Sequence, residues 1–271
     1  MQQLDGRPAR GPSSANCCAA LRACWSIAFQ SCIVGSPDPS GAVIMSLSRM
    51  SEPVDLAKLD PATLAKHLAN PEGTVGIAVT AGLNRSNAAL YTAVLAKLAV
   101  QGRERILEIG FGNGHEIGRL ISGAPGLVYT GVDVSETMVA EAALRNAVPI
   151  ENGQVTLRHA SSSALPFSGG LFDKALALNT IYFWDNPVVD LTEIRRVLRD
   201  DGRLVLGAIA PWSTKNREHY RYGFRFYNVE ELTTLCTKAG FSAVGIEVLN
   251  DQTVSVSGEK VTRDYFIVAA E

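Results

Sequence analysis

The stretch Arg105-Ile-Leu-Glu-Ile-Gly-Phe-Gly-Asn-Gly-His115 decides the fold of this 271-residue chain. Its apolar run predicts a buried parallel strand, and Gly110, Gly112 and Gly114 predict a tight turn that leads into a helix. Glycine has no Cβ, so the backbone can adopt φ > 0 and a ligand can lie against the main chain. The stretch therefore predicts a strand, turn and helix that hold a nucleotide-like ligand.

The spacing of these glycines excludes two common phosphate-binding turns. A dinucleotide-binding turn requires G-x-G-x-x-G, but the third glycine position is occupied by His115 or Ile117, depending on the register. A P-loop ends in Gly-Lys-Ser/Thr, a tripeptide that the chain lacks. Glu108, at the end of the strand, would repel a pyrophosphate and would suit a ligand that carries an ammonium group.

A second acid follows at the end of the next predicted strand. The segment Val128-Tyr-Thr-Gly-Val-Asp-Val134 places Asp133 roughly 20 residues after the glycines, where a carboxylate can hold a ribose diol through two charge-assisted hydrogen bonds. A helix is predicted over 136–145, so Asp133 or Ser135 could instead cap its N-terminus. Both interpretations of Asp133 remain open from the sequence.

These motifs resemble those of class I S-adenosylmethionine-dependent methyltransferases, in particular the small-molecule, methyltransferase type 11-like branch. The first motif reads LEIGFGNG and the second reads GVDVSETMV. The resemblance covers roughly residues 62–271 and continues through 160–167, similar to the family's G-D-A-x-x-L-P-F loop, then 172–179 and 191–206. Four motifs in the family's order are a much more specific signal than any one of them.

The resemblance implies S-adenosylmethionine as cofactor and the transfer of its methyl group to a small-molecule acceptor by direct in-line displacement. It assigns the cofactor site to Glu108, Gly110, Phe111, Gly112, Asn113, Gly114, Asp133, Val134, Met138, Ser161, Ser162 and Asn179. Glu108 and the glycines would lie by the amino-acid part, Asp133 by the ribose, and Val134 and Met138 beside the adenine. Where the family often has an acid for the adenine amino group, this chain has Ser161, a weaker acceptor.

The alternation of strands and helices predicts an α/β fold with helices on both faces of the sheet. Strands are expected near 105–109, 128–132, 154–158, 173–178, 203–209, 242–249 and 262–269. The last two have turn residues and no helix between them, so they should pair as an antiparallel hairpin at one edge. The fold class expected is a Rossmann-like, seven-stranded, mostly parallel sheet with one antiparallel edge strand and an N-terminal helical lid.

The chain divides into two parts by composition. Residues 1–50 hold four of the five cysteines and are expected to be a poorly ordered extension, with Met45 or Met50 as the working start. A secretory signal is the less favoured interpretation of its apolar run, since it would carry the enzyme away from a cytosolic cofactor. Residues 51–271 are expected to form the methyltransferase domain, with a helical lid over 51–100 and the catalytic core over 101–271. Its one cysteine, Cys236, excludes a disulfide framework there.

The acceptor should lie at the carboxyl ends of the fourth and fifth strands, next to the aromatic-rich loops 179–185 and 211–227. A sulfonium methyl is already electrophilic, so positioning matters more than acid–base chemistry. If a general base exists, the candidates by location are His219, Tyr182, Asp185 and Tyr220. Arg217, Arg221 and Arg225 recur every four residues, so on a helix they would share one face, either solvated or facing an anionic substrate.

Composition limits the partners. The net charge of −2 provides no basic field, and no dense Lys/Arg run with interleaved aromatics is present, so nucleic acid is disfavoured. We expect a cytoplasmic enzyme with a small-molecule substrate, no membrane partner and no metal; the oligomeric state is not determined. Two alternatives remain: a fold-retaining cofactor-binding or regulatory protein without turnover, and a nicotinamide-dependent oxidoreductase, which the glycine spacing and Glu108 oppose.

Overall fold

The structure, a computed structural model, describes residues 54–215 and 217–271. The chain separates into two units, Met1–Glu52 and Pro53–Glu271, and all the elements described below belong to the second. The extension expected over residues 1–50, with its four cysteines, lies outside the described residues.

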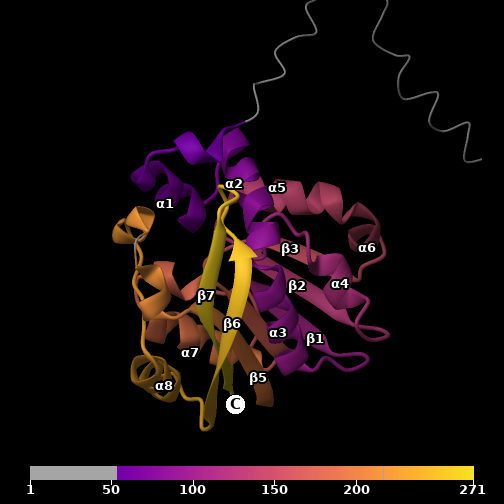
Figure 1. Ribbon diagram of the computed structural model, residues 1–271. Coiled ribbons are helices and arrows are strands. Elements are labelled where there is room, and N and C mark those ends of the chain that lie inside the picture. The colour runs from indigo at the N-terminus through magenta and orange to yellow at the C-terminus, as the bar shows by residue number, and fades with distance from the viewer. Residues whose placement is uncertain (1–53, 216) are drawn as a thin grey trace, which may run out of the picture. The chain divides into compact units, whose positions relative to one another are not determined.

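Seven strands form one sheet in the order β3-β2-β1-β4-β5-β7-β6 (Figure 1). Their bounds are β1 Arg105–Ile109, β2 Val128–Asp133, β3 Val155–His159, β4 Phe172–Leu178, β5 Leu198–Ile209, β6 Val244–Val254 and β7 Lys260–Ala270. The first five strands are parallel, as the alternation with helices predicts. β1, with its Ile-Leu-Glu-Ile sequence, is buried from its second residue onward and lies at the centre of the parallel part.

The last two strands form the predicted antiparallel hairpin at one edge of the sheet. The reversed strand β7 pairs with β5, and β6 is the edge strand beyond it. Both strands are longer than expected, because the reversal occurs over residues 255–259 and the pairing continues to Val254 opposite Lys260. Because β7 is antiparallel, its first residues lie beside the carboxyl end of β5, where Ile209 pairs with Tyr265.

The helices cover both faces of the sheet. Their bounds are α1 Pro61–Ala69, α2 Gly73–Ser86, α3 Ala88–Leu98, α4 Ile117–Ile121, α5 Glu136–Arg145, α6 Ala147–Glu151, α7 Pro187–Val197 and α8 Val229–Lys238, with short 3-10 helices η1 Leu56–Lys58, η2 Ile181–Phe183, η3 Pro211–Thr214 and η4 Glu218–Arg221. In Figure 1, α3 lies on one side of the β6–β7 hairpin and α7 and α8 lie on the other. α3 contacts β4 to β7, whereas α7 contacts β5 and α8 contacts β6.

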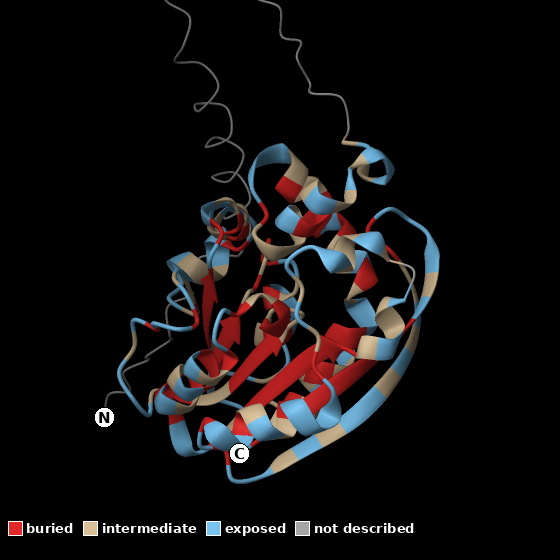
Figure 2. Cartoon of the chain, turned by 90° about the vertical axis from the view of Figure 1, so that its left-hand side faces the viewer, coloured by how far each residue is buried: buried red, intermediate tan, exposed pale blue. Residues whose placement is uncertain are grey.

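The strands provide most of the buried core, as the red strands of Figure 2 show. The N-terminal helices have a second, smaller apolar cluster, in which Leu64 of α1 and Val79 of α2 pack against Val256 in the hairpin turn. α1 and α2 are therefore held to the rest of the domain by few apolar side chains, and they border the cavity at the carboxyl ends of the parallel strands.

Candidate functional site

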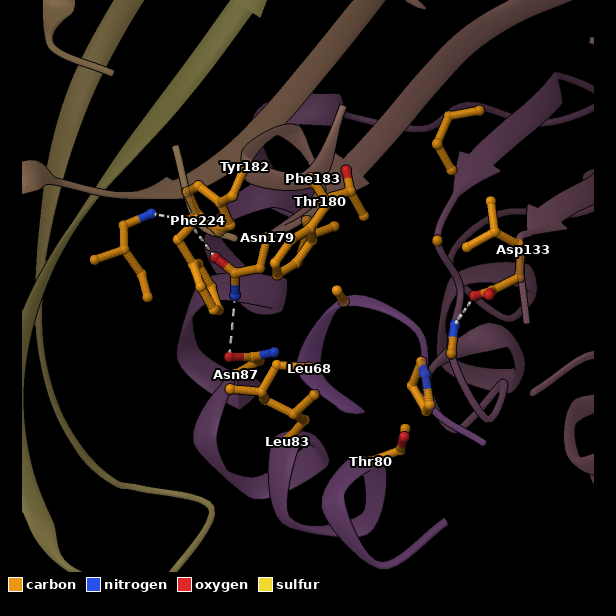
Figure 3. A pocket seen from close by; sticks show the side chains of 18 of the residues that line it. Leu68, Thr80, Leu83, Asn87, Asp133, Asn179, Thr180, Tyr182, Phe183 and Phe224 are labelled. Carbon is orange, nitrogen blue, oxygen red and sulfur yellow. Dashed lines mark hydrogen bonds between the residues drawn. The ribbon is translucent and has the colours of Figure 1, made fainter. Parts of the chain in front are cut away.

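A cavity of about 690 Å³ opens at the carboxyl ends of β1, β2 and β4, beside α1 and α2 (Figure 3). Its volume lies within the range of small-molecule and cofactor sites, roughly 300 to 1,000 Å³. The predicted cofactor-site residues that line it are Glu108, Gly110, Phe111, Gly112, Asp133, Val134, Ser161, Ser162 and Asn179. All four candidate general bases, His219, Tyr182, Asp185 and Tyr220, line the same cavity. Residues more than 100 positions apart in the sequence thus share one space.

Glu108 is a carboxyl group buried at the end of β1. Its Oε2 accepts hydrogen bonds from the Tyr129 hydroxyl at 2.8 Å and the Tyr91 hydroxyl at 3.2 Å. Burial raises the pKa of Glu108 to about 7, and the two tyrosine hydrogen bonds oppose that rise. Near pH 7 the protonated and ionised forms of Glu108 are therefore similarly populated. A cation placed beside the group would lower its pKa and favour the carboxylate.

Asp133 ends β2 and lies at the opposite end of the cavity from Tyr182 and Phe224 (Figure 3). Its Oδ2 accepts from the Gly112 backbone N–H and its Oδ1 from the Ser135 N–H, both at 2.9 Å. Burial raises its pKa to about 6 against the effect of these amides. The N-cap of α5 is Ser135, whose hydroxyl accepts from the Met138 N–H. Asp133 therefore is not the helix cap, and each of its oxygens retains a lone pair for a ligand.

Two of the glycines in the turn have different tasks. Gly110 has φ of 75°, and a Cβ there would come within 2.4 Å of the Thr180 methyl, so the turn passes close to the loop after β4. Gly114 has φ of 67°, and a Cβ there would come within 2.7 Å of Ala142 and of the Asn146 amide on the α5 side. Gly114 is therefore required for helix packing, whereas Gly110 and Gly112 line the cavity.

Three predicted cofactor residues do not line the cavity: Asn113, Gly114 and Met138. The Asn113 side chain is buried, and its Oδ1 accepts from the His115 N–H at 3.2 Å. Met138 is fully buried, and its sulfur accepts from the hydroxyl of Thr80, which stands between it and the cavity wall. The helical position of Met138 indicates core packing here, which its spacing in the sequence could not distinguish from a ligand contact.

Sequence reasoning missed Asp190, a buried acid on the first turn of α7. The Ser162 hydroxyl donates to its Oδ1 at 2.5 Å, and burial raises the pKa of Asp190. Asp190 lines the cavity together with Ser161 and Ser162, the loop in which the family's acid is missing. Its place in the sequence, 29 positions after Ser161, gave no sign of this contact, because α7 is brought to the loop only by the packing of the domain.

Asn179 and Tyr182 connect the end of β4 to the N-terminal helices and to β5. The Tyr182 hydroxyl donates to Asn179 Oδ1 at 2.8 Å and accepts from the Ile209 N–H, and Asn179 Nδ2 donates to Asn87 Oδ1 at 3.2 Å (Figure 3). Asn179 has φ of 53°, in the left-handed region that asparagine tolerates. Next to it, the buried Thr180 hydroxyl has no partner among the described residues.

The four candidate bases differ in their hydrogen bonds, in the direction in which burial shifts their pKa, and in their exposure. Tyr182 uses its hydroxyl in both directions within the protein, and burial raises its pKa well above the usual value, which argues against a role as a base. Burial, then Arg217 and Arg263, lowers the pKa of His219 to about 4, so its ring is neutral at pH 7. Burial raises the pKa of Tyr220. Asp185 is exposed at the rim.

The arginine repeat does not form a helical face. Residues 218–221 make only the short η4, and Arg221 and Arg225 are exposed, the latter with its guanidinium 5.4 Å from the Tyr227 ring. Of the three, only Arg217 lines the cavity, and it is joined there by Arg263 of β7, which the sequence did not single out. The spacing predicts a shared face only if the segment is helical, and Gly223, with φ of 76°, breaks it.

Within residues 54–215 and 217–271, no cluster of three or more His, Cys, Asp or Glu side chains could hold a metal ion. Over the same residues, no helix is long and apolar enough to span a bilayer.

Comparison with known proteins agrees with this geometry. Residues 107–206 match the family described as "Methyltransferase domain". The O-methyltransferase resE of Aspergillus sclerotiorum is 32% identical over 111 residues, 41% of this chain and 42% of that protein. The 27-O-demethylrifamycin SV methyltransferase of Amycolatopsis mediterranei is 29% identical over 128 residues, 47% of each chain. The chain thus matches less than half the length of these two relatives.

Solved structures show the same fold at low identity. A SAM-dependent methyltransferase from Thermotoga maritima superposes with a TM-score of 0.51 and 23% identity over 69% of this chain and 91% of that one. A phosphoethanolamine N-methyltransferase 2 from Haemonchus contortus, solved with phosphomonomethylethanolamine and S-adenosylhomocysteine, superposes with a TM-score of 0.55 and 18% identity over 67% of this chain and 52% of that one.

The sheet order and these matches give the chain the fold of class I S-adenosylmethionine-dependent methyltransferases. Residues 107–206, a little over a third of the chain, are similar to the methyltransferase-domain family. The Thermotoga maritima protein is S-adenosylmethionine-dependent, and the Haemonchus contortus enzyme was solved with S-adenosylhomocysteine.

The residues of the cavity fit this cofactor. S-adenosylmethionine carries an ammonium, a ribose diol and an adenine, and the cavity presents two buried carboxyl groups, Glu108 and Asp133, at the ends of adjacent strands. The unpartnered hydroxyl of Thr180 lines the same wall and can bond a polar ligand atom. A pyrophosphate, in contrast, would have to lie against both acids.

Proposed function

We propose that this chain transfers a methyl group from S-adenosylmethionine to a small-molecule acceptor. The observation that carries the proposal is the pairing of Glu108 and Asp133, both buried and both facing one cavity, with an aromatic end of that cavity left for a second molecule. The dinucleotide alternative has no support here, because the turn lacks the third glycine and places acids where phosphates would lie.

The roles we propose for the cofactor residues follow from their positions. Glu108 faces the ammonium group, Gly110 and Gly112 lie along the amino-acid part, and Asp133 accepts from the ribose hydroxyls. Val134, exposed at the cavity wall, covers one face of the adenine. We assign the adenine amino group to Asp190, which the Ser162 hydroxyl holds in place, since Ser161 offers only a hydroxyl.

When bound, the cofactor supplies an electrophilic methyl group. The residues at the ends of β4 and β5 then have to orient the acceptor in line with it and exclude water, and no strong base is required. Asn179 and Tyr182 fix the wall between the two halves through their hydrogen bonds, and α1 and α2 lie over it. The acceptor gives up a proton as the new bond to carbon forms, and His219, neutral at pH 7, faces that part of the cavity.

Further expectations are proposed with the function. Residues 51–100 would act as the lid and 101–271 as the catalytic core. Asn84 and Asn87, which line the cavity, would be the contacts of the lid with the bound ligands. A cytoplasmic location would give the enzyme access to its cofactor.

The proposal is tested by calorimetric titration of the full chain with S-adenosylmethionine, S-adenosylhomocysteine and a nicotinamide dinucleotide. We expect micromolar binding of the first two and none of the third. Turnover is then measured with labelled S-adenosylmethionine and candidate acceptors. Binding without turnover over a broad panel would favour the fold-retaining binding protein, and failure to bind either sulfur compound would refute the proposal.

A further inference from the structure

Arg263 is a buried cation without an ionic partner in the acceptor half of the cavity. Its side chain is 6% exposed, yet it lines the cavity. Nη1 donates to the Ser86 hydroxyl at 2.9 Å and to the Tyr265 hydroxyl at 3.4 Å, and Nε has no partner. Within residues 54–215 and 217–271, no carboxylate lies within 4 Å of the guanidinium. A buried charge is normally paired, so this group lacks the anion its chemistry requires.

Asp251 is the nearest alternative partner within the fold. It lies opposite Arg263 in the β6–β7 register, and the positive charge of Arg263 lowers its pKa, although burial has the larger, opposite effect. The two groups nevertheless form no ion pair, and Asp251 Oδ2 itself has no hydrogen-bond partner. Both groups retain unused hydrogen-bonding capacity, and of the two it is Arg263 that lines the cavity.

A second cation, Arg217, lines the same end of the cavity. Its side chain is 18% exposed, and its Nη1 lies 3.8 Å from the carboxylate of Glu259, which is itself largely exposed and forms only a loose pair with it. Arg217 and Arg263 both lower the pKa of the His219 imidazole, after burial, so their fields meet at that ring. Two guanidinium groups from separate elements therefore act on His219, whereas the acids that line this part of the cavity, Glu218 and Glu259, are exposed.

Aromatic rings form the adjoining wall. The Phe224 ring lies 4.6 Å from the Phe183 ring and 5.0 Å from the Tyr220 ring, and Figure 3 shows Phe224 and Phe183 on the side of the cavity away from Asp133. Such a wall suits the flat apolar body of a small molecule. The cavity thus combines this apolar wall with a cationic corner, formed by Arg217 and Arg263.

The position of Arg263 separates it from the cofactor residues. β7 is removed from β1 by β4 and β5, three strand spacings or about 14 Å. Arg263 thus lies beyond β5, on the acceptor side, whereas Glu108 and Asp133 end β1 and β2. The carboxylate of the cofactor is the competing ligand for this arginine, and the experiment below distinguishes the two.

We infer that the methyl acceptor is a small aromatic acid, whose carboxylate or phosphate is bound by Arg263 and Arg217 while its ring packs on Phe224 and Phe183. The inference rests on the proposed function, since it names the acceptor class of the same site. A guanidinium presents paired N–H donors that match the oxygens of either group.

The test is calorimetric titration of the full chain, saturated with S-adenosylhomocysteine, with benzoate, phenyl phosphate and the neutral benzamide. We expect the better of the two acids to bind at least about tenfold more tightly than benzamide, the ratio that one charge-assisted hydrogen bond provides. Benzoate and phenyl phosphate identify which acid the corner prefers. Equal binding of the acids and the amide, or no binding of either acid, would overturn the inference.

Variants of Arg263 distinguish binding of the acceptor's acid group from a purely structural role of this side chain. Arg263→Gln should remove the preference for acids with S-adenosylhomocysteine affinity unchanged, and Arg263→Lys should retain part of it. Arg225→Gln is the matched control, because that arginine is exposed outside the cavity and should leave the preference intact. If Arg263→Gln instead weakens S-adenosylhomocysteine binding, the cofactor is its ligand and the inference is wrong.

If Arg263→Gln does not fold, Arg217→Gln decides, because that side chain is less buried. It should lower the acid-to-amide ratio, and an unchanged ratio would count against the inference. Failure of the proposed function gives a different result: the wild-type chain would either not bind S-adenosylhomocysteine, or bind it and transfer no methyl group to any acceptor.

Discussion

Asp133 and Glu108 are two buried carboxyl groups of the cavity that are held by different partners. Asp133 is held by two backbone amides at the end of β2, and Glu108 by two tyrosine hydroxyls at the end of β1. Burial raises the pKa of both groups, to about 6 and about 7 respectively. A ligand that stabilises the carboxylate form therefore releases a proton on binding, from Glu108 near pH 7 and from Asp133 only near pH 6 and below.

Asp133→Asn should weaken S-adenosylhomocysteine binding by about tenfold to a hundredfold, since it replaces charge-assisted hydrogen bonds to the ribose with neutral ones. Calorimetric titration measures the change, and a thermal melt shows that the variant is folded. Glu136→Gln, an exposed acid three residues later, is the control and should bind normally. Unchanged affinity of a folded Asp133→Asn variant would contradict the ribose assignment.

The pH dependence of cofactor binding should follow Glu108. Its raised pKa means that the free protein holds a proton near pH 7, and a ligand ammonium lowers that pKa, so binding releases the proton and becomes tighter as pH rises through about 6 to 7. The amino group of the ligand loses its own proton near pH 8, which ends the rise. Calorimetry in buffers of different ionisation enthalpy counts the protons released, and Glu108→Gln should abolish the proton release near pH 7, where Asp133 is already mostly ionised.

Asp190→Asn should weaken binding of S-adenosylhomocysteine by about fivefold to tenfold, because an adenine amino group loses a charged acceptor. The analogue of S-adenosylhomocysteine with unsubstituted purine in place of adenine, which lacks the amino group, serves as the comparison ligand. The variant and the wild type should bind this analogue about equally. An equal loss for both ligands would show that Asp190 acts only through the Ser162 loop.

At the scale of elements, the turn between β1 and α4 is held by packing against α5 as much as by its own sequence. Gly114 lies against Ala142 and Asn146, and the Asn146 amide donates to its carbonyl at 3.1 Å. Gly114 thus lets α5 pack closely against the turn, and the N-cap of α5 is Ser135, two residues after Asp133. The cofactor turn and the ribose acid are thus parts of one packed unit.

Gly114→Ala should destabilise the protein by about 2 to 4 kcal/mol. The backbone at this position has φ of 67°, which alanine adopts with strain, and the added Cβ would come within 2.7 Å of the Ala142 and Asn146 side chains. Chemical denaturation measures the free energy of unfolding. Gly118→Ala is the matched control: this glycine lies in α4, and a Cβ there would have no atom within 4 Å. The control should be neutral or slightly stabilising, and equal losses for both would remove the packing argument.

For the whole molecule, every residue placed in the cavity belongs to the unit Pro53–Glu271. The parallel strands bring Glu108, Asp133 and Asn179 together at their carboxyl ends. The β6–β7 hairpin adds Arg263 from the C-terminal part of the chain. Because residues from both ends of this unit line the cavity, the cavity is complete only when the whole sheet has formed. Ligand binding should therefore require the folding of the complete domain.

A chain that begins at residue 50 should therefore keep the melting temperature and the S-adenosylhomocysteine affinity of the full chain. Differential scanning calorimetry with and without the ligand checks both. Removal of residues 1–82 is the contrasting truncation, since it deletes α1 and most of α2, and it should lose the ligand-dependent rise in melting temperature. A large loss on removing residues 1–49 would show that this segment takes part in the site.

The sequence by itself determined the class of fold and the positions of the glycine turn and of the acids at the ends of β1 and β2. Strand β1 was predicted with its observed bounds, because a short apolar run before a glycine turn has few other structures. Five of the turn and strand-end positions from Glu108 to Asp133 line the cavity as expected, since these residues are local to the strands that present them. The acid at the end of β2 was found for the same reason.

Only the tertiary structure decided which side chains meet from distant segments. Asp190 reaches Ser162 through α7, Arg263 reaches the cavity because β7 runs antiparallel beside β5, and Met138 is buried in the core. Periodicity fixes which face of an element is apolar, but not which neighbour covers it. The turn and strand-end residues of the cavity follow from local patterns along the chain, whereas the contacts of Asp190 and Arg263 depend on segments far apart in the sequence.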